Sequence, residues 1–148
     1  MLQKHEVPFV VTGGLAAKAY GSSRALNDID LDIPSQDFSR IFPDIKPYVI
    51  FGPSRYLDEK WDLPLITLDH HGQEIDIGGG DDTKIYDAKN KKWTLIPAGF
   101  SYARKMEIFG LVVPVVPAEQ LIAYKSLLDG DHQKVDIRAA ESFIKSRA

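Results

Sequence analysis

The most regular pattern of hydrophobic and polar positions in the chain is the alternation over residues 28–33, DIDLDI. A period of two is typical of a β-strand, because alternate side chains of a strand point to opposite faces. One face of this strand therefore carries Ile29, Leu31 and Ile33, and the other carries three aspartates. Pro34 follows directly, and we expect it to end the strand.

Two segments before this strand predict a further strand and a helix. Residues 7–12 (VPFVVT) are β-branched and apolar, as in a short buried strand. The alanine-rich residues 15–20 (LAAKAY) predict a helix, and Gly21 is placed to end it. A glycine pair at positions 13 and 14 connects the two elements.

Prolines shape the segment that follows residue 34. We expect Ser35 to begin a short helix that continues to about Ile41. Prolines at positions 43, 47 and 53 then predict an irregular, partly extended region up to about residue 62, because proline lacks the backbone N–H that helices and central strands use.

Two strands joined by a hairpin turn are expected next. Residues 63–68 and 73–77 have strand character, and residues 69–72 (DHHG) have the composition of a turn. His70 and His71 are adjacent at this turn, so we interpret them as turn residues rather than as metal ligands. The segment 78–82 (GGGDD) predicts a flexible or tightly turned loop.

The last part of the chain is expected to contain three strands and two helices. The strands are predicted near residues 93–96, 105–109 and 111–116. Pro117 begins a predicted helix that Gly130 ends, and a last helix is predicted from about 132 to 145. The apolar face of this last helix, which we expect to point toward the core, comprises Val135, Ala139, Ala140, Phe143 and Ile144.

This succession of strands and helices favours an α/β (α+β) fold, with a mixed β-sheet flanked by helices. The length of 148 residues suits one domain with one core. We therefore expect a single domain over residues 1–148, with the C-terminal helices, about 117–147, packed on it.

Composition narrows the classes of protein and of site. The absence of cysteine excludes a disulfide framework, a zinc finger, a cysteine nucleophile and an iron–sulfur cluster, so a metal would bind oxygen or imidazole. The net charge is -3 and no region is strongly basic, so we do not expect duplex DNA as a partner. No apolar run approaches the roughly 18–20 residues that span a bilayer, and Met1–Val10 lacks the order of a signal peptide. We therefore expect a cytoplasmic protein that does not enter the membrane.

The acidic face of residues 28–33 is the first candidate for chemistry. Asp28, Asp30 and Asp32 share this face with Cβ atoms about 7 Å apart, so their charges repel unless cations or solvent screen them. Mg²⁺ prefers oxygen ligands and is commonly bound by one or two carboxylates together with substrate phosphates. Asp28 and Asp30 have the spacing for such a site. The alternative is an exposed acidic strand that discourages edge-to-edge pairing and binds nothing.

A weaker copy of the pattern occurs over residues 73–77 (QEIDI), where Glu74 and Asp76 share one face. If this strand is a neighbour of residues 28–33, a third carboxylate joins the site. Two metal ions held by such carboxylates would stabilise the attacking and leaving oxygens of phosphoryl or nucleotidyl transfer.

Gly13, Gly14 and Arg24 are candidates for phosphate binding. The glycine pair begins the predicted helix, where backbone N–H groups are free and the helix dipole favours an anion. Arg24 lies between this helix and the acidic strand, and a guanidinium can pair with a terminal phosphate. In isolation the glycines indicate only a tight turn, and Arg24 only a surface residue. The order strand, Gly-Gly, helix, Arg, Asp-x-Asp is the informative part.

This order resembles the DNA polymerase β-like nucleotidyltransferase superfamily, and within it the small stand-alone (minimal) nucleotidyltransferases of bacteria and archaea. The resemblance is carried by VVTGGLAAKAYGSSRALNDIDLDI, and the order of elements can be followed through Asp76 into the C-terminal helices. One departure is Leu26, which stands where many relatives have a threonine or serine.

The resemblance implies roles for the residues that match the family pattern. Gly13 and Gly14 would help to hold a nucleoside triphosphate, and Asp28 and Asp30 would bind divalent metal ions, Mg²⁺ or Mn²⁺. Asp76 would be the third metal-binding and catalytic carboxylate, which orients or deprotonates the acceptor hydroxyl.

The C-terminal helices add one candidate through the same resemblance. The segment VPAEQLIAYKSLLDGDHQKVDI contains Lys125 and Asp136, which match a lysine and a later aspartate that recur in relatives. Lys125 is implied as a nucleotide contact. The alternative is an exposed lysine on an amphipathic helix.

The remaining motifs give weaker indications of function. The aromatic residues Trp61, Trp93, Tyr56 and Tyr86 could stack on a base, but we interpret them as core or interface residues. A Walker A motif and a Gly-x-Ser-x-Gly elbow are absent from the sequence, so neither P-loop nor serine hydrolysis is favoured.

The sequence therefore leads to the hypothesis of a metal-dependent nucleotidyltransferase that transfers a nucleoside monophosphate from an NTP such as ATP to an acceptor hydroxyl. The acceptor would be a small molecule, an RNA end or a protein. The alternative is a catalytically inactive nucleotidyltransferase-like binding module or a toxin–antitoxin component, and a homo-oligomer or a partner protein is compatible with both.

Overall fold

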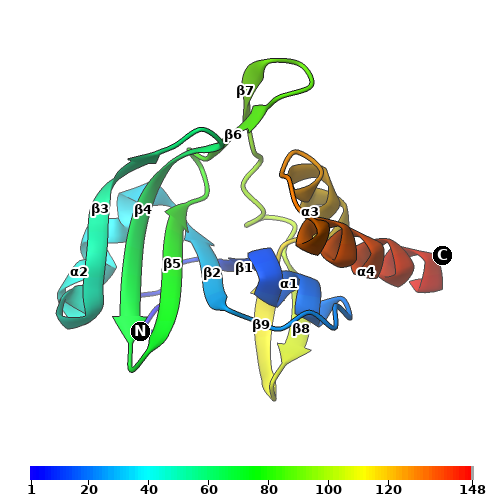
Figure 1. The fold of residues 1–148 in the computed structure, drawn as a ribbon. Helices are drawn as coiled ribbons and strands as arrows, with labels where there is room; N and C mark the ends of the chain where they lie inside the picture. Colours follow the sequence, from blue (N-terminus) through cyan, green and yellow to red (C-terminus); the bar gives the residue numbers. More distant parts are fainter. Residues whose placement is uncertain (148) are drawn as a thin grey trace.

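The computed structural model describes residues 1–147. A mixed β-sheet forms the centre of the fold (Figure 1). Its strands are β1 (Val10–Thr12), β2 (Asp28–Ile33), β3 (Val49–Leu57), β4 (Trp61–His70), β5 (Gln73–Gly79), β6 (Lys84–Asp87), β7 (Lys92–Leu95), β8 (Arg104–Ile108) and β9 (Leu111–Val115). They lie in the order β7-β6-β4-β5-β2-β1-β9-β8, and β3 pairs with β4 off this path.

Four α-helices accompany the sheet in the described residues. They are α1 (Gly13–Ala19), α2 (Phe38–Ile45), α3 (Ala118–Lys125) and α4 (Asp131–Arg147). In Figure 1, α2 lies behind β3 and β4, whereas α1, α3 and α4 gather beside β1, β8 and β9. The predicted α+β fold with a mixed sheet flanked by helices is confirmed. Within residues 1–147, no helix is both long and apolar enough to span a bilayer.

Strand β2 lies in the middle of the sheet, where antiparallel pairing changes to parallel pairing. It pairs antiparallel with β1 and parallel with β5. Its bounds, Asp28–Ile33, are those that the alternating pattern predicts. Asp30 lies between Thr12 of β1 and Asp76 of β5, so the acidic faces of β2 and β5 coincide.

Two buried apolar clusters hold the elements around β2. One joins α2 to β2 and β4 and includes Ile33, Ile41 and Ile66, each fully buried. The other joins α1, α3 and α4 to β1 and β9, and Ala16 and Leu121 are among its fully buried residues. The elements that carry the glycine pair and the aspartates are therefore fixed by cores on two sides.

The prolines between residues 43 and 53 do not produce the irregular region that the sequence predicts. Pro43 lies inside α2, which continues to Ile45 because its apolar face is buried in the first cluster. Pro53 lies within β3 at a register irregularity. β3 has a partner on one side only, and an edge strand tolerates a proline because the missing N–H has no neighbour to bond.

Three other predictions about elements are corrected. Gly78 and Gly79 belong to β5 rather than to a loop, because Gly78 pairs with Asp32 and with Leu65 on either side. Helix α3 ends at Lys125, before the predicted stop at Gly130. Residues 84–87, for which the sequence predicts no strand, form β6 and pair with β7.

The predicted apolar face of α4 is confirmed in part. Ala140 is buried, and Phe143 and Ile144 pack against the second cluster as predicted, whereas Val135 is exposed. Gln133 and Asp136 are buried as well, and an apolar periodicity cannot reveal these two polar positions.

Candidate active site

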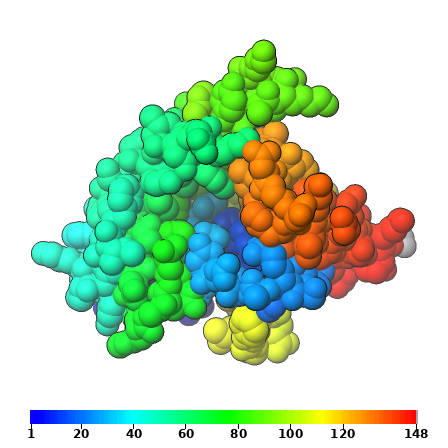
Figure 2. Space-filling view, in the orientation of Figure 1, coloured from blue at the N-terminus to red at the C-terminus, as the bar shows by residue number. Residues whose placement is uncertain are grey.

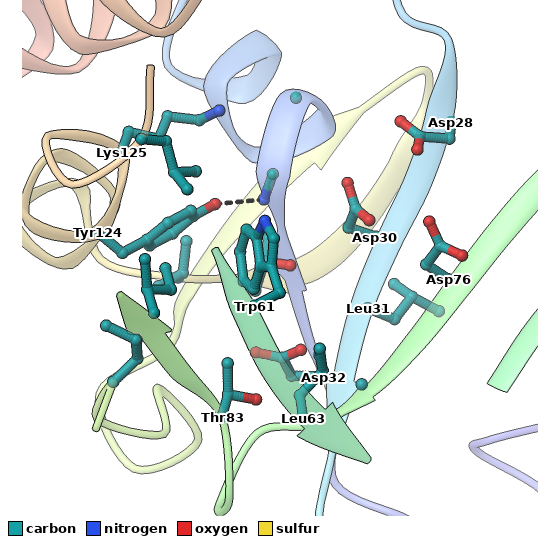
Figure 3. A pocket seen from close by; sticks show the side chains of 18 of the residues that line it. Asp28, Asp30, Leu31, Asp32, Trp61, Leu63, Asp76, Thr83, Tyr124 and Lys125 are labelled. Atoms are coloured by element: carbon teal, nitrogen blue, oxygen red, sulfur yellow. Dashed lines mark hydrogen bonds between the residues drawn. The ribbon is translucent and has the colours of Figure 1, made fainter. Parts of the chain in front are cut away.

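Asp28, Asp30 and Asp76 meet on the neighbouring strands β2 and β5. One carboxylate oxygen of each lies within 4.8 Å of the others. The parallel register places Asp30 opposite Asp76, and Figure 3 shows the three carboxyl groups gathered on one side of the cleft. We refer to these residues as the carboxylate triad. The structure thus brings together the three acids that the sequence singles out.

Burial and the repulsion of neighbouring acids raise the pKa values of Asp30 and Asp76. Burial, together with the charges of Asp28 and Asp76, raises the pKa of Asp30 to about 8. Burial also raises the pKa of Asp76, although the Thr67 hydroxyl donates a hydrogen bond of 2.7 Å to its carboxylate. Glu74, on the same face of β5, has a raised pKa mainly because of the charge on Asp76. The charge of Lys125 lowers the pKa of Asp30, but it does not offset burial and the repulsion of the other acids.

The triad has the donor set of a site for a hard divalent cation. All three ligand groups are carboxylates, which Mg²⁺ and Mn²⁺ accept, and they converge on one point from two rigid strands. A cation bound there would convert the repulsion that raises the pKa of Asp30 into attraction. The residues present therefore fit such an ion, and Asp28, Asp30 and Asp76 would hold it.

The glycine pair stands directly against the triad. Gly13 has a positive φ of 63°, and a Cβ atom at this position would overlap the Asp30 carboxylate. A Cβ on Gly14 would lie 2.8 Å from Nη2 of Arg24. The Gly13 N–H donates a hydrogen bond of 2.6 Å to the Tyr124 hydroxyl (Figure 3). At position 13 only glycine combines this backbone conformation with so close an approach to Asp30.

Arg24 and Lys125 converge on one buried aspartate, Asp136 of α4. Arg24 donates from Nε and Nη2 to the two carboxylate oxygens, at 3.2 and 2.7 Å. The Ser22 hydroxyl donates at 2.7 Å, and Lys125 Nζ lies 3.1 Å from the same carboxylate. Lys125 also donates to Gln133 at 2.9 Å. We call these five residues the Asp136 network.

The Asp136 network satisfies its own charges. Burial alone would raise the pKa of Asp136, but the hydrogen bonds from Arg24, Ser22 and Lys125 outweigh it and hold that pKa below its usual range. Arg24, which the sequence places as a phosphate ligand, is thus already paired through two of its nitrogens. Lys125 is buried, not exposed on an amphipathic helix.

A cleft of about 880 Å³ separates the triad from α3 and α4. Figure 2 shows the hollow between the strands in green and the helices in orange. Residues from the strands and from the helices line this cleft. They include Gly13, Gly14, Arg24, Asp28, Asp30, Asp32, Asp76, Tyr124, Lys125 and Gln133. This volume is in the range of small-molecule and cofactor pockets.

Two of the four aromatic residues singled out in the sequence line this cleft. Trp61 and Tyr56 contribute to its walls, and Trp61 also packs against the apolar cluster of α1, α3 and α4, as the core interpretation expects. Trp93 is exposed on β7 and packs against Tyr86 with ring centroids 5.5 Å apart. The cleft therefore offers an aromatic surface next to its charged groups (Figure 3).

Sequence reasoning missed two residues that shape the site. Tyr124 is buried on α3 next to Lys125, and its hydroxyl fixes the Gly13 N–H. Asp136 carries no site role in the sequence analysis, although it accepts the hydrogen bonds of Arg24. The available signal is the spacing of Gln133, Asp136 and Ala140, which places polar residues on the face that the structure buries.

Three solved structures share this arrangement of elements. A Thermotoga maritima protein provisionally assigned as a nucleotidyltransferase aligns with a TM-score of 0.68 and 24% identity, over 97% of this chain and 84% of that one. The lincosamide antibiotic adenylyltransferase LnuA, with lincomycin bound, aligns with a TM-score of 0.62 and 14% identity, over 96% and 90%. ANT(2")-Ia, in complex with adenylyl-2"-tobramycin, aligns with a TM-score of 0.62 and 15% identity, over 99% and 92%.

No protein-family model matches the sequence, and no curated protein matches it either. The structural likeness spans nearly the whole chain, so the protein has the fold of these nucleotidyltransferases. The fold agrees with the resemblance that the sequence carries around its glycine pair and its Asp-x-Asp strand.

Proposed function

We propose that this protein is a metal-dependent nucleotidyltransferase, which transfers a nucleoside monophosphate from an NTP to an acceptor hydroxyl. The observation that supports this most is the convergence of the carboxylate triad and the glycine pair in one cleft, with Arg24 and Lys125 on the opposite wall. Metal-binding acids and phosphate-binding groups are the two requirements of this chemistry.

Each part of the cleft has a role in the proposed reaction. The glycine pair allows a triphosphate to approach the backbone, and the guanidinium of Arg24 is held beside it by Asp136. The acceptor oxygen attacks the α-phosphorus, the bond to the bridging oxygen breaks, and pyrophosphate leaves with the bonding electrons. Asp76, whose pKa is raised, receives the proton of the acceptor hydroxyl. Bound at the triad, Mg²⁺ or Mn²⁺ would stabilise the charge on the attacking and leaving oxygens.

The acceptor is proposed to be a small molecule. LnuA is a lincosamide antibiotic adenylyltransferase, and ANT(2")-Ia is seen with adenylyl-2"-tobramycin. The chain carries a net charge of -3, and acidic side chains line the cleft. Both features disfavour a large polyanionic acceptor such as RNA. We therefore place hydroxylated small molecules first among the acceptors to test.

The test is transfer of label from an α-labelled NTP. The protein is incubated with each of the four NTPs, Mg²⁺ and a small-molecule cell extract, and products are separated by chromatography. We expect a labelled product and released pyrophosphate. The Asp28→Asn/Asp30→Asn variant should give none, because it removes two ligands of the triad. The matched control, Glu107→Gln/Glu141→Gln, removes two exposed acids elsewhere and should retain transfer.

The same proteins separate the enzyme from the alternative of a binding module. An NTP with Mg²⁺ should raise the Tm of the wild type and not that of the triad variant, because a ligand of the folded state stabilises it. Stabilisation without transfer to any acceptor would favour the binding module or a toxin–antitoxin component. Neither stabilisation nor transfer would refute the proposal.

A further inference from the structure

Within residues 1–147, the sheet has three strands with a partner on one side only, namely β3, β7 and β8. Such an edge presents backbone N–H and C=O groups to which another strand can add. Strand β3 contains Pro53 and irregularities in its register, which obstruct that pairing. Strand β7 has four residues, and Lys92 is its only charged one. Strand β8 is regular, contains no proline and carries charges of both signs, so we consider its edge further.

The turn between β8 and β9 determines which backbone groups of β8 point outward. It consists of two residues, Phe109 and Gly110, with φ values of 49° and 84°, as in a type I′ turn. The residue pair that flanks such a turn is hydrogen-bonded, and pairs with and without hydrogen bonds alternate along antiparallel strands. The backbone N–H and C=O groups of Glu107, and those of Lys105 two residues earlier, therefore point away from β9.

The side chains of the same two residues carry opposite charges. Lys105 and Glu107 are both exposed and share one face of β8. They lie opposite Pro114 and Val112 of β9, and neither forms an ion pair in the described part of the chain. The hairpin of β8 and β9 projects from the rest of the molecule (Figures 1 and 2). Its outer edge thus presents one positive and one negative side chain, two positions apart.

A second copy of the chain matches this edge in one register. When two identical strands pair antiparallel about a two-fold axis, each residue lies opposite the one at the same distance beyond the axis. With the axis at Met106, Lys105 lies opposite Glu107 of the second copy, and the reverse pair forms as well. In the neighbouring registers, with the axis at Lys105 or at Glu107, like charges lie opposite each other. Charge complementarity therefore selects the register centred on Met106.

The same register brings exposed aromatic residues together at both ends of the paired strands. Tyr102 and Phe109 are 76% and 75% exposed. In this register Phe109 of one copy lies opposite Ala103 of the other, next to Tyr102. Aromatic residues are enriched in protein–protein interfaces, and their burial would add to the backbone hydrogen bonds.

We propose that this protein forms a homodimer in which β8 pairs antiparallel with β8 of a second copy, with the two-fold axis at Met106. The dimer joins the two sheets and is held by backbone hydrogen bonds of Lys105 and Glu107 and by the ion pairs of their side chains. No residue from 104 to 115 lines the cleft, so both clefts stay open and the dimer does not require the proposed enzymatic activity.

Sedimentation equilibrium tests for the dimer. The paired edge is short, so we expect a dissociation constant on the order of 10 μM, with monomer at about 1 μM and dimer at about 300 μM. Glu107→Lys and Lys105→Glu should each weaken self-association at least about tenfold, because each places like charges opposite one another. The matched control is Glu59→Lys, in the exposed turn between β3 and β4, which should associate like the wild type.

Mixing the two variants tests the register. An equimolar mixture of Glu107→Lys and Lys105→Glu should associate again, because the positive edge of one variant then meets the negative edge of the other. Restored association also shows that both variants are folded. A mixture that stays monomeric, or single variants that associate like the wild type, would overturn the inference.

Hydrogen exchange in the wild type tests the strand pairing itself. The amides of Lys105 and Glu107 point away from β9, so they should exchange more slowly when the protein concentration rises from about 1 to about 300 μM. A protein that stays monomeric over this range, or a dimer in which these two amides exchange as fast as in the monomer, would exclude pairing through β8.

Discussion

Both walls of the cleft carry charged groups, but the charges are arranged in opposite ways. On the strand wall, formed by the acidic faces of β2 and β5, like charges face one another, and the pKa of Asp30 is raised to about 8. On the helix wall, formed by the Asp136 network, opposite charges are paired and the pKa of Asp136 is held below its usual range.

This difference distinguishes a wall that stabilises the fold from a wall that we expect to bind a ligand. The helix wall is complete without a ligand, because each carboxylate oxygen of Asp136 has a donor. On the strand wall, burial and like charges raise the pKa values of Asp30 and Asp76, and perturbed pKa values are typical of functional sites. Removing a charge should therefore harm folding on the helix wall and function on the strand wall.

The largest effect is expected when the strand wall is neutralised. Asp28→Asn/Asp30→Asn should lower the rate of nucleotidyl transfer at least about 10³-fold, because charge stabilisation at the reacting phosphorus is lost. The free energy of unfolding should stay the same or increase, since two like charges are removed. Initial rates and urea titrations measure the two quantities. A variant that is both inactive and markedly less stable would contradict the separation of the walls.

Breaking the helix wall should have the next largest effect. Asp136→Ala leaves Arg24 and Lys125 without their carboxylate partner, which should lower the free energy of unfolding by about 3–5 kcal/mol. Urea denaturation measures it. Val135→Ala, on the exposed face of the same helix, should change stability by no more than about 0.5 kcal/mol. Similar losses in both variants would mean that helix propensity, rather than the network, is being measured.

Acid should weaken the helix wall with a defined sign. In the folded protein Asp136 keeps its charge to a lower pH than in the unfolded chain. Its contribution to stability is therefore full above the usual aspartate pKa, about 4, and declines as the pH falls through the lowered native value. We expect the stability difference between wild type and Asp136→Asn to be constant from about pH 5 to 7 and to shrink below about pH 4. A difference that grows in acid would show that the pKa of Asp136 is raised instead.

The smallest predicted effect concerns the hydrogen bond between the glycine pair and Tyr124 of α3. Tyr124→Phe removes the hydroxyl that accepts the Gly13 N–H and should reduce the free energy of unfolding by about 1–2 kcal/mol. Thermal unfolding measures the change, and Tyr102→Phe, at an exposed tyrosine, is the control that should have no effect. An unchanged Tm for Tyr124→Phe would mean that another group satisfies Gly13.

The strand wall was predictable from the sequence, whereas for the helix wall the sequence indicated Arg24 and Lys125 but not their pairing with Asp136. The alternation of DIDLDI depends only on local geometry, and it gives the bounds and the faces of β2. The meeting of Asp76 with Asp30 required the added assumption that the two strands are neighbours, which the parallel register of β5 with β2 satisfies. These predictions hold because one buried face of each strand is plainly apolar.

Predictions failed where tertiary contacts override local signals. The buried face of α4 contains Gln133 and Asp136, whose burial depends on cations from residues more distant in sequence. Pro43 is tolerated within α2 because the helix packs against β2 and β4. The glycines of β5 indicate a loop until the side chain of Asp32, on another strand, is placed beside them. Arg24 and Asp136 are 112 positions apart, and Asp32 and Gly78 come from strands that are not consecutive, so no local window of sequence contains both partners of these two contacts.

The parallel pairing of β2 with β5 also has a consequence for the order of folding. Asp30 and Asp76 meet across a strand pair whose partners are 46 positions apart, whereas the hairpin of β4 and β5 is local. Closing the long loop is slow, and it is slowed further when its final step brings like charges together. We expect Mg²⁺ in the refolding buffer to accelerate this docking step. An ion that binds the triad would then also assist folding, because the strands would become ordered in the same step in which the metal site forms.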